Sequence, residues 1–194
     1  MNILAGQDYV DGIFVNDEYG NVPGALPTSA IRLMGSSPLP SPTIAVTFKT
    51  FSTDPKNPVT TGVQISDYNL QQGQGMHGSF GRANTFNFMA AIGPDFKKHF
   101  VDPAPVSNAD IAPTLAHILG LEIPGNGKLQ GRVLQEALAG GPASISSMRQ
   151  ITISANSSNG KKTILMYQQA GEQVYFDQAC FKSAPARHSR AGCP

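Results

Sequence analysis

Cysteine, charge and long apolar runs are all scarce in this chain, and each scarcity excludes a class of protein. The two cysteines, Cys180 and Cys193, lie near the C-terminus, so they could form one terminal disulfide but not a disulfide framework. Charged residues make up only 14% of the chain and the formal net charge is +1, which argues against a nucleic-acid polymer or an anionic membrane as partner. No apolar stretch approaches membrane-spanning length and the N-terminus lacks a secretion signal, so we expect a soluble chain.

The remaining composition is that of a folded domain. Hydrophobic residues account for 40% of the 194 residues, which is enough to bury a core within one domain. The last residues, 183–194, are small, basic and proline-containing, and we expect them to form a disordered tail.

Several stretches predict β-structure. Residues 8–16 have the β-branched and aromatic content of one bent strand, and residues 17–20 follow as a turn. Residues 150–177 alternate like strands joined by tight turns. Residues 43–48 predict a strand with one apolar face, formed by Ile44, Val46 and Phe48.

One helix can be placed from its end signals. Asp110 is the expected N-cap, Pro113 falls in the first turn, and Gly120 ends the helix. We expect its apolar face to pack on the sheet, while His117 lies off that face as a surface residue. The apolar face comprises Ile111, Leu115, Ile118 and Leu119. A second short helix is predicted over residues 132–138.

The most distinctive stretch places His77 in a glycine-rich loop ahead of an apolar run. Residues 86–92 are apolar and end at Gly93 and Pro94, which predicts a buried strand. Imidazole is the commonest metal-binding side chain, although a lone histidine in such a loop is more often simply exposed. Asp95 and His99 have the spacing of a helical ligand pair, but the lysines between them favour a solvated turn.

The order of segments along the chain resembles the C-terminal part of the alkaline phosphatase superfamily, in particular its type I phosphodiesterase/nucleotide pyrophosphatase branch. The resemblance implies an α/β fold, namely the C-terminal part of an α/β/α sandwich with terminal β-strands, as a partial domain over residues 1–182. Its specificity comes from the ordered co-occurrence of the segments. They are YVDGIFVNDEYGNVPGALPTSAIRL, His77-Gly78, Met89 to Phe96, Ser107 to Thr114, Leu119-Gly120-Leu121, GRVLQEAL and VYFDQA.

The same resemblance implies a hydrolytic function, but this chain contains only part of the residues that this function requires. Members hydrolyse phosphate or sulfate esters at a metal pair, usually zinc, with a Thr or Ser nucleophile, and they are often exported. His77 occupies the place of the last metal ligand. The preceding ligands and the nucleophile have no counterpart here, and no Asp-His dipeptide occurs.

We therefore expect a C-terminal fragment of a metal-dependent phosphodiesterase or phosphatase that is inactive alone. Its substrate would be a phosphate ester in the complete enzyme, and its partner an N-terminal half encoded upstream. An alternative is a non-catalytic binding or structural module derived from that fold. Because a zinc site takes three or four protein ligands, one histidine would not hold the ion tightly.

Overall fold

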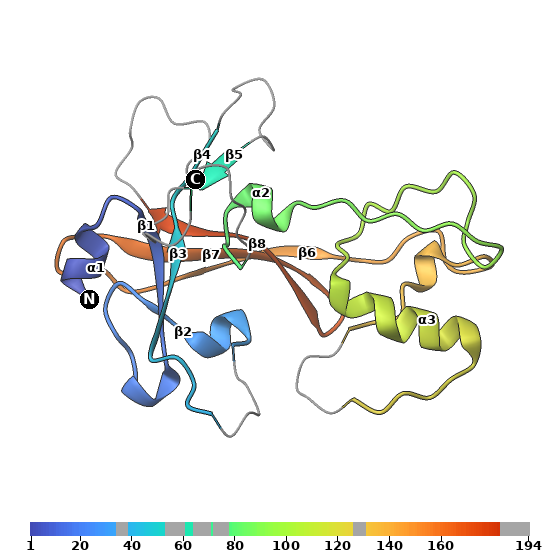
Figure 1. Ribbon diagram of the computed structural model, residues 1–194, viewed down its shortest axis with the longest axis horizontal. Helices are drawn as coiled ribbons and strands as arrows, with labels where there is room; N and C mark the ends of the chain where they lie inside the picture. The colour runs from blue at the N-terminus through green and yellow to red at the C-terminus, as the bar shows by residue number, and fades with distance from the viewer. Residues whose placement is uncertain (34–38, 53–60, 64–70, 72–77, 126–130, 183–194) are drawn as a thin grey trace.

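The computed structural model describes residues 1–33, 39–52, 61–63, 71, 78–125 and 131–182. It contains short helices and three small sheets, so the predicted mixed α/β character is confirmed. Figure 1 shows the first sheet at one end of the long axis, helix α3 at the other, and the longest strands running between them. Two further predictions, His77 in its loop and the tail 183–194, lie outside the described residues.

The first sheet confirms two predicted strands. Its central strand β1 (Val10–Val15) pairs in parallel with β2 (Leu26–Pro27) and antiparallel with β3 (Ile44–Phe48). The turn expected after β1 is a single 3-10 turn, η1 (Asp17–Tyr19), in which the Asn16 side chain accepts from the Glu18 amide.

The apolar face predicted for β3 is confirmed only in part, because Val46 packs against a hydrophobic cluster but Ile44 is exposed. The buried residue of the strand is Thr47. Thr47 lies where the backbone of Gly12 comes so close that an added Cβ would be 2.8 Å from its methyl group. Its hydroxyl oxygen also accepts from the Phe80 amide at 3.2 Å. A threonine can fill this position because its polar atom is satisfied there, which hydrophobic alternation alone does not predict.

A β-bulge at Asp11 sets which side chains of β1 face each core. The pairing passes from Val10 opposite Phe48 to Gly12 opposite Thr47, so Asp11 is the extra residue. Consequently Val10 and Ile13, three residues apart, enter the same hydrophobic cluster although a regular strand would place them on opposite faces.

The bulge residue Asp11 is half-buried. Burial raises its pKa to about 6 from 3.8, against the lowering effects of the Phe181 amide and of Lys49 and Lys161. The amide of Phe181 donates to it at 3.3 Å. Because the folded state has the raised pKa, the contribution of Asp11 to stability is greatest below about pH 4 and is lost as the pH rises through about 6.

We expect Asp11→Asn to remove this pH dependence. The amide oxygen can still accept from the Phe181 amide but carries no charge, so the free energy of unfolding should rise at pH 8 by at most about 3 kcal/mol. At pH 4 the variant and the wild type should be equally stable. Urea unfolding at both pH values measures the difference, with Asp95→Asn at an exposed position as control. Equal effects of the two substitutions at pH 8 would contradict the expectation.

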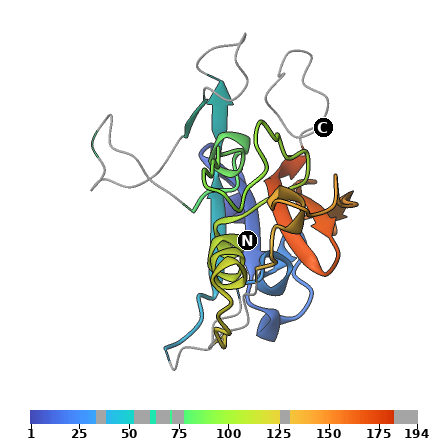
Figure 2. The same ribbon diagram turned by 90° about the vertical axis from the view of Figure 1, so that its right-hand side faces the viewer.

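The antiparallel strands predicted over residues 150–177 are confirmed as a three-stranded sheet. Its strands are β6 (Met148–Ile153), β7 (Lys162–Ala170) and β8 (Gln173–Lys182), in the order β6-β7-β8. Figure 2 shows this sheet as a second layer beside β1 and β3. The two layers are tied by the Ile13 amide, which donates to the Thr163 hydroxyl at 3.1 Å.

Strand β8 contributes to every packed region of the described chain. Phe181 belongs to the cluster with Val10 and Ile13, and Ala179 to a second cluster with Phe14. Nearer the beginning of β8, the Tyr175 hydroxyl accepts a hydrogen bond from Arg132. This contact lies close to the start of helix α3, because the same hydroxyl donates to Asp110. The strand therefore connects the two ends of the molecule, as Figure 1 shows.

The apolar run 86–92 is not the buried strand predicted for it. Helix α2 (Arg82–Thr85) precedes it, and the run itself is irregular. Phe88 is 90% exposed and Ile92 is 99% exposed. Composition and length predicted a strand, but a strand needs hydrogen-bonding partners, and within the described residues this run pairs with no other segment.

Helix α3 (Ile111–Leu119) is confirmed in position, in its N-cap residue Asp110 and in its end, but not in its packing. It ends at Gly120, which has φ 65°, as predicted. A 3-10 turn, η3 (Asn108–Asp110), precedes it, and the capping side chain is that of Ser107. The buried helix residues are Thr114 and Ala116, so the predicted packing of its apolar face on the sheet is wrong.

The helix predicted over residues 132–138 is only a 3-10 turn, η4 (Gln135–Ala137). The remaining short elements complete the described chain. They are α1 (Asn2–Gly6), η2 (Thr28–Ile31), β4 (Thr50–Ser52) and β5 (Thr61–Val63).

Candidate functional site: a buried polar cluster around Arg132

The histidines and cysteines of the sequence do not form a site within the described residues. His77 and Cys193 lie outside them, and Cys180 is disulfide-bonded. His99 and Asp95 are exposed in turns, which confirms the solvated reading of that pair. His117 is exposed on α3, as predicted. No three His, Cys, Asp or Glu side chains of the described residues are placed to hold a metal ion.

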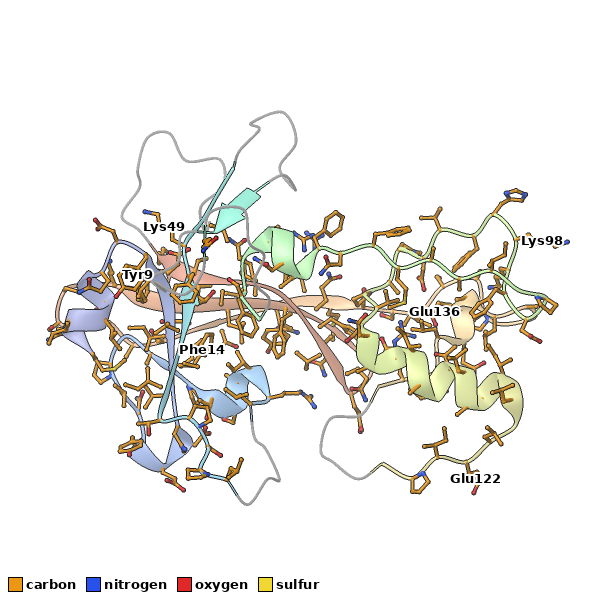
Figure 3. The ribbon with its side chains drawn as sticks, in the orientation of Figure 1. Tyr9, Phe14, Lys49, Lys98, Glu122 and Glu136 are labelled. Carbon is orange, nitrogen blue, oxygen red and sulfur yellow. The ribbon has the colours of Figure 1, made fainter. Side chains whose placement is uncertain are left out.

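The structure instead brings together a buried group of polar side chains, which we call the Arg132 cluster: Asp102, Asp110, Arg132, Glu136 and Tyr175. Arg132 and Glu136 form its centre, because the two guanidinium ends donate to the two carboxylate oxygens at 2.6 and 2.8 Å. Glu136 is fully buried. Figure 3 shows it inside the end of the molecule near α3, where Lys98 and Glu122 point outward.

Arg132 binds more than its carboxylate partner. Its Nε donates to the Tyr175 hydroxyl at 2.8 Å, and one terminal nitrogen donates to the Pro105 carbonyl at 3.1 Å. One side chain thus connects η4, strand β8 and the segment before α3. A guanidinium suits this position because its planar fork directs several donors at once.

Asp110 closes the cluster from the start of α3. Its buried carboxylate accepts from the Ser107 and Arg132 amides, both at 2.8 Å, and from the Tyr175 hydroxyl at 3.3 Å. The expected N-cap residue therefore acts as the partner of the cap residue Ser107 and as an anchor for the chain at Arg132.

The backbone beside this anchor is packed too closely for a side chain. A Cβ at Gly131 would lie 1.9 Å from the Ala109 carbonyl oxygen. Thr114 makes a second link, because its hydroxyl donates to the Asp110 carbonyl at 2.7 Å and accepts from the Leu134 amide at 3.0 Å. Segments 107–114 and 131–136 are therefore held together by both main-chain and side-chain groups.

The electrostatics of the cluster keep its members in defined charge states. Burial alone would raise the pKa of Glu136, but the hydrogen bonds and charge of Arg132 hold that pKa below its ordinary value. Burial would likewise lower the pKa of Arg132, yet Glu136 and Tyr175 keep it above its ordinary value. Burial raises the pKa of Tyr175 to about 12. At neutral pH the cluster thus contains a guanidinium cation, a carboxylate and a neutral phenol.

This arrangement positions chain segments and does not resemble catalytic machinery. The Tyr175 hydroxyl is not suited to act as a general base, because with a pKa of about 12 it stays protonated at neutral pH. Arg132 and Glu136 satisfy one another, so neither is directed at a substrate. The spacing of these two residues, four apart in GRVLQEAL, is the signal by which the sequence could have revealed them, since i,i+4 pairs of opposite charge approach one another on a helical turn.

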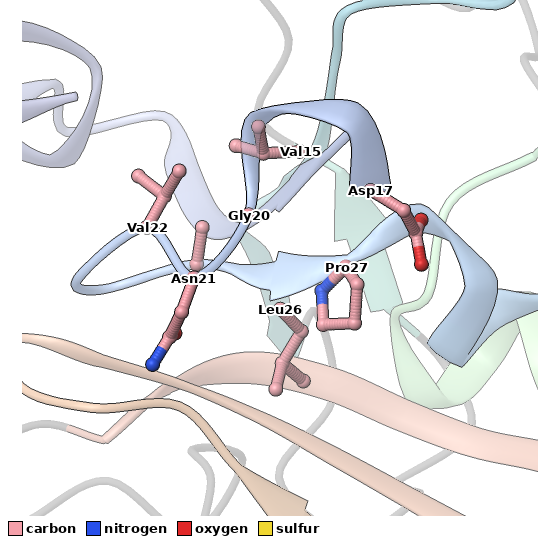
Figure 4. Close-up of a pocket in the computed structure, with 8 residues that line it drawn as sticks. Val15, Asp17, Gly20, Asn21, Val22, Leu26 and Pro27 are labelled. Carbon is pink, nitrogen blue, oxygen red and sulfur yellow. The ribbon is translucent and has the colours of Figure 1, made fainter.

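A separate pocket of about 300 Å³ lies beside η1 (Figure 4). The Asp17 carboxylate at its edge accepts from the Thr28 hydroxyl at 2.9 Å and from the amide and hydroxyl of Ser29. The Ser29 hydrogen bonds hold the pKa of Asp17 below its ordinary value. Thr28 and Ser29, which carry these hydroxyl groups, are not among the residues that line the pocket, and Asp17 is its only titratable lining residue, so we assign the pocket no chemistry. Its lining residues are Val15, Asp17, Gly20, Asn21, Val22, Ala25, Leu26 and Pro27.

Within the described part of the chain, no helix combines the length and apolar character that crossing a membrane requires. Comparisons of the sequence and structure with protein-family models, with curated proteins and with solved structures find no match.

Proposed function

We propose that this chain is the C-terminal portion of a metal-dependent phosphodiesterase or phosphatase of the alkaline phosphatase superfamily, and that it does not hydrolyse esters alone. One observation carries the proposal: three of the segments on which the resemblance depends meet in the Arg132 cluster. Asp110 comes from SNADIAPT, Arg132 and Glu136 from GRVLQEAL, and Tyr175 from VYFDQA.

The convergence supports the proposal because the matched segments contain the residues that hold the fold together at this end. A chance match would distribute its residues without regard to contact. Here the Asp110 carboxylate accepts from the Arg132 amide and from the Tyr175 hydroxyl, across 22 and 65 residues of sequence. The segments are therefore spatially related as well as ordered along the chain.

The exposed apolar face of α3 is a second support. Ile111, Leu115 and Leu119 are 43%, 47% and 67% exposed. A helix turns such a face toward another layer in most folded domains. In the proposed α/β/α sandwich, that layer belongs to the remainder of the sheet, which the described residues do not supply.

The chemistry proposed for the complete enzyme needs groups that the described residues do not bring together. The described residues do not assemble a metal-binding set, so we derive no step through zinc. His77, the one ligand that the resemblance assigns, lies outside the described residues. The role proposed for this chain's own described residues is to hold the segments of the C-terminal portion in place through the Arg132 cluster.

We expect the purified chain to be free of stoichiometric zinc and not to turn over bis-p-nitrophenyl phosphate or p-nitrophenyl phosphate when zinc is added. In-line displacement without a positioned nucleophile and a second metal loses most of its transition-state stabilisation. Metal analysis and a colorimetric assay test both expectations, with His77→Ala as the matched control.

Three outcomes distinguish an active enzyme, a non-catalytic module and a portion of a larger sandwich. Zinc-dependent turnover above that of His77→Ala would show that the chain is itself an enzyme. A monodisperse, cooperatively unfolding monomer without zinc would favour the non-catalytic module. Oligomers or aggregates would favour the proposed portion of a larger sandwich, because exposed apolar faces associate.

A further inference from the structure

Asp102 has one carboxyl oxygen that is buried and unsatisfied. Its Oδ1 accepts from the Ala104 amide at 2.9 Å, whereas its Oδ2 is buried without a hydrogen-bond donor among the described residues. A buried carboxylate oxygen that lacks a donor costs free energy, so such an atom requires an explanation. The segment that carries Asp102 lies beside Glu136, because one terminal nitrogen of Arg132 donates both to the Pro105 carbonyl and to the Glu136 carboxylate. The two carboxyl groups also shift each other's pKa through a side-chain hydrogen bond.

The cations near this pair are directed elsewhere. The terminal nitrogens of Arg132 donate to the Glu136 carboxylate and to the Pro105 carbonyl, and Nε donates to Tyr175. Lys97 donates to the carbonyl oxygens of Glu136 and Pro142, not to a carboxylate.

If every acid in the cluster were ionised, three carboxylates would face only two cations, the Arg132 guanidinium and the Lys97 ammonium. Asp110 and Glu136 are both almost completely buried, so the excess negative charge could not be screened by solvent. A proton bound between Asp102 and Glu136 removes one negative charge. It also allows the unsatisfied Oδ2 of Asp102 to form a hydrogen bond.

We propose that Asp102 and Glu136 share one proton, with the Asp102 carboxylic acid donating from Oδ2 to the Glu136 carboxylate. The shared proton makes this contact a pH-sensitive latch between residues 102–107 and η4. Glu136 is the ionised partner because both of its oxygens also accept from Arg132.

The direction of the pH dependence follows from the surroundings of Asp102. Burial raises its pKa above the ordinary value, and the charge and hydrogen bond of Glu136 raise it further. The closed latch therefore binds a proton that the open segment releases. It is most stable below the ordinary pKa of an aspartate and weakens as the pH rises toward the raised pKa.

Opening of the latch between residues 102–107 and η4 would also affect the start of helix α3. Residues 102–107 contain Pro105, whose carbonyl accepts from Arg132, and Ser107, whose side chain caps the turn before α3. Release of the segment would remove both contacts. The pH would thus control whether the start of α3 stays tied to η4.

Amide hydrogen exchange on the full chain between pH 4 and pH 9 tests the latch. After correction for the intrinsic pH dependence of exchange, protection at the Ala104 and Arg132 amides should fall by up to tenfold per pH unit and then level off. The Ser154 amide, which bonds to Thr163 in the distant hairpin, is the internal control. Its protection should change less.

Asp102→Asn is the matched variant, because its amide can donate permanently to Glu136 while its oxygen still accepts from the Ala104 amide. In this variant, we expect the protection of the Ala104 and Arg132 amides against hydrogen exchange to be independent of pH. A variant with the same slope as the wild type would overturn the proposal. A carbon-13 titration of Asp102 in the wild-type chain does not depend on that variant, and titration in the ordinary aspartate range would equally refute the shared proton.

Discussion

Replacing Arg132 by methionine is expected to lower the free energy of unfolding by about 3–5 kcal/mol. The guanidinium makes two hydrogen bonds to Glu136, and Glu136 is fully buried. Without its partner, that carboxylate must either remain charged in a site without solvent or take up a proton. The substitution also removes the donors to Tyr175 and to the Pro105 carbonyl.

Urea unfolding followed by circular dichroism measures this loss. Arg149→Met on the exposed part of β6 is the matched control, and it should change stability by about 0.5 kcal/mol or less. The double variant Arg132→Met, Glu136→Met should regain part of the loss, because no buried charge is left unpaired. A single variant as stable as its control would mean that the cluster is not closed in solution.

Gly131→Ala is expected to cost on the order of 3 kcal/mol, at the upper end for overpacking. The added methyl group would lie 1.9 Å from the Ala109 carbonyl oxygen and 2.8 Å from the Asp110 nitrogen. Both are main-chain atoms, so they cannot move aside by changing a rotamer. Relief requires the two segments to separate, which weakens the bond from the Arg132 amide to Asp110.

Gly125→Ala provides the matched control. It adds the same methyl group to the same residue type six positions earlier, where an added Cβ would meet no atom within 4 Å. We expect its free energy of unfolding to stay within about 0.5 kcal/mol of the wild type. If the two alanine variants lost stability equally, the close approach at Gly131 would not exist in solution.

The parts of the fold that could be predicted are those with a local signal. Strand β1, the strands β6 to β8 and helix α3 follow from alternation, turn residues and the αL-favouring Gly120. The burial of an element depends on what lies opposite it, which no local signal contains. For that reason Leu115 and Phe88, both strongly apolar, were predicted in the core and are exposed.

The Arg132 cluster could likewise be predicted only where its residues are close in sequence. The i,i+4 spacing of Arg132 and Glu136 can be read from the sequence, which also predicts Asp110 at the start of a helix. Their meeting with Tyr175 could not be predicted, because that contact joins residues 43 positions apart through the path of β8. His77 stays a prediction, since it lies outside the described residues.

The position of β8 has a consequence for how the chain acquires its structure during synthesis. Val10 and Ile13 pack against Phe181, and the Ile13 amide bonds to Thr163, 150 residues later. Contacts of such long sequence separation form slowly, because a large loop must close before they contribute. Of the described strands, β1 leaves the ribosome early and must wait for β8, the last of them, so its apolar side chains stay exposed in the meantime.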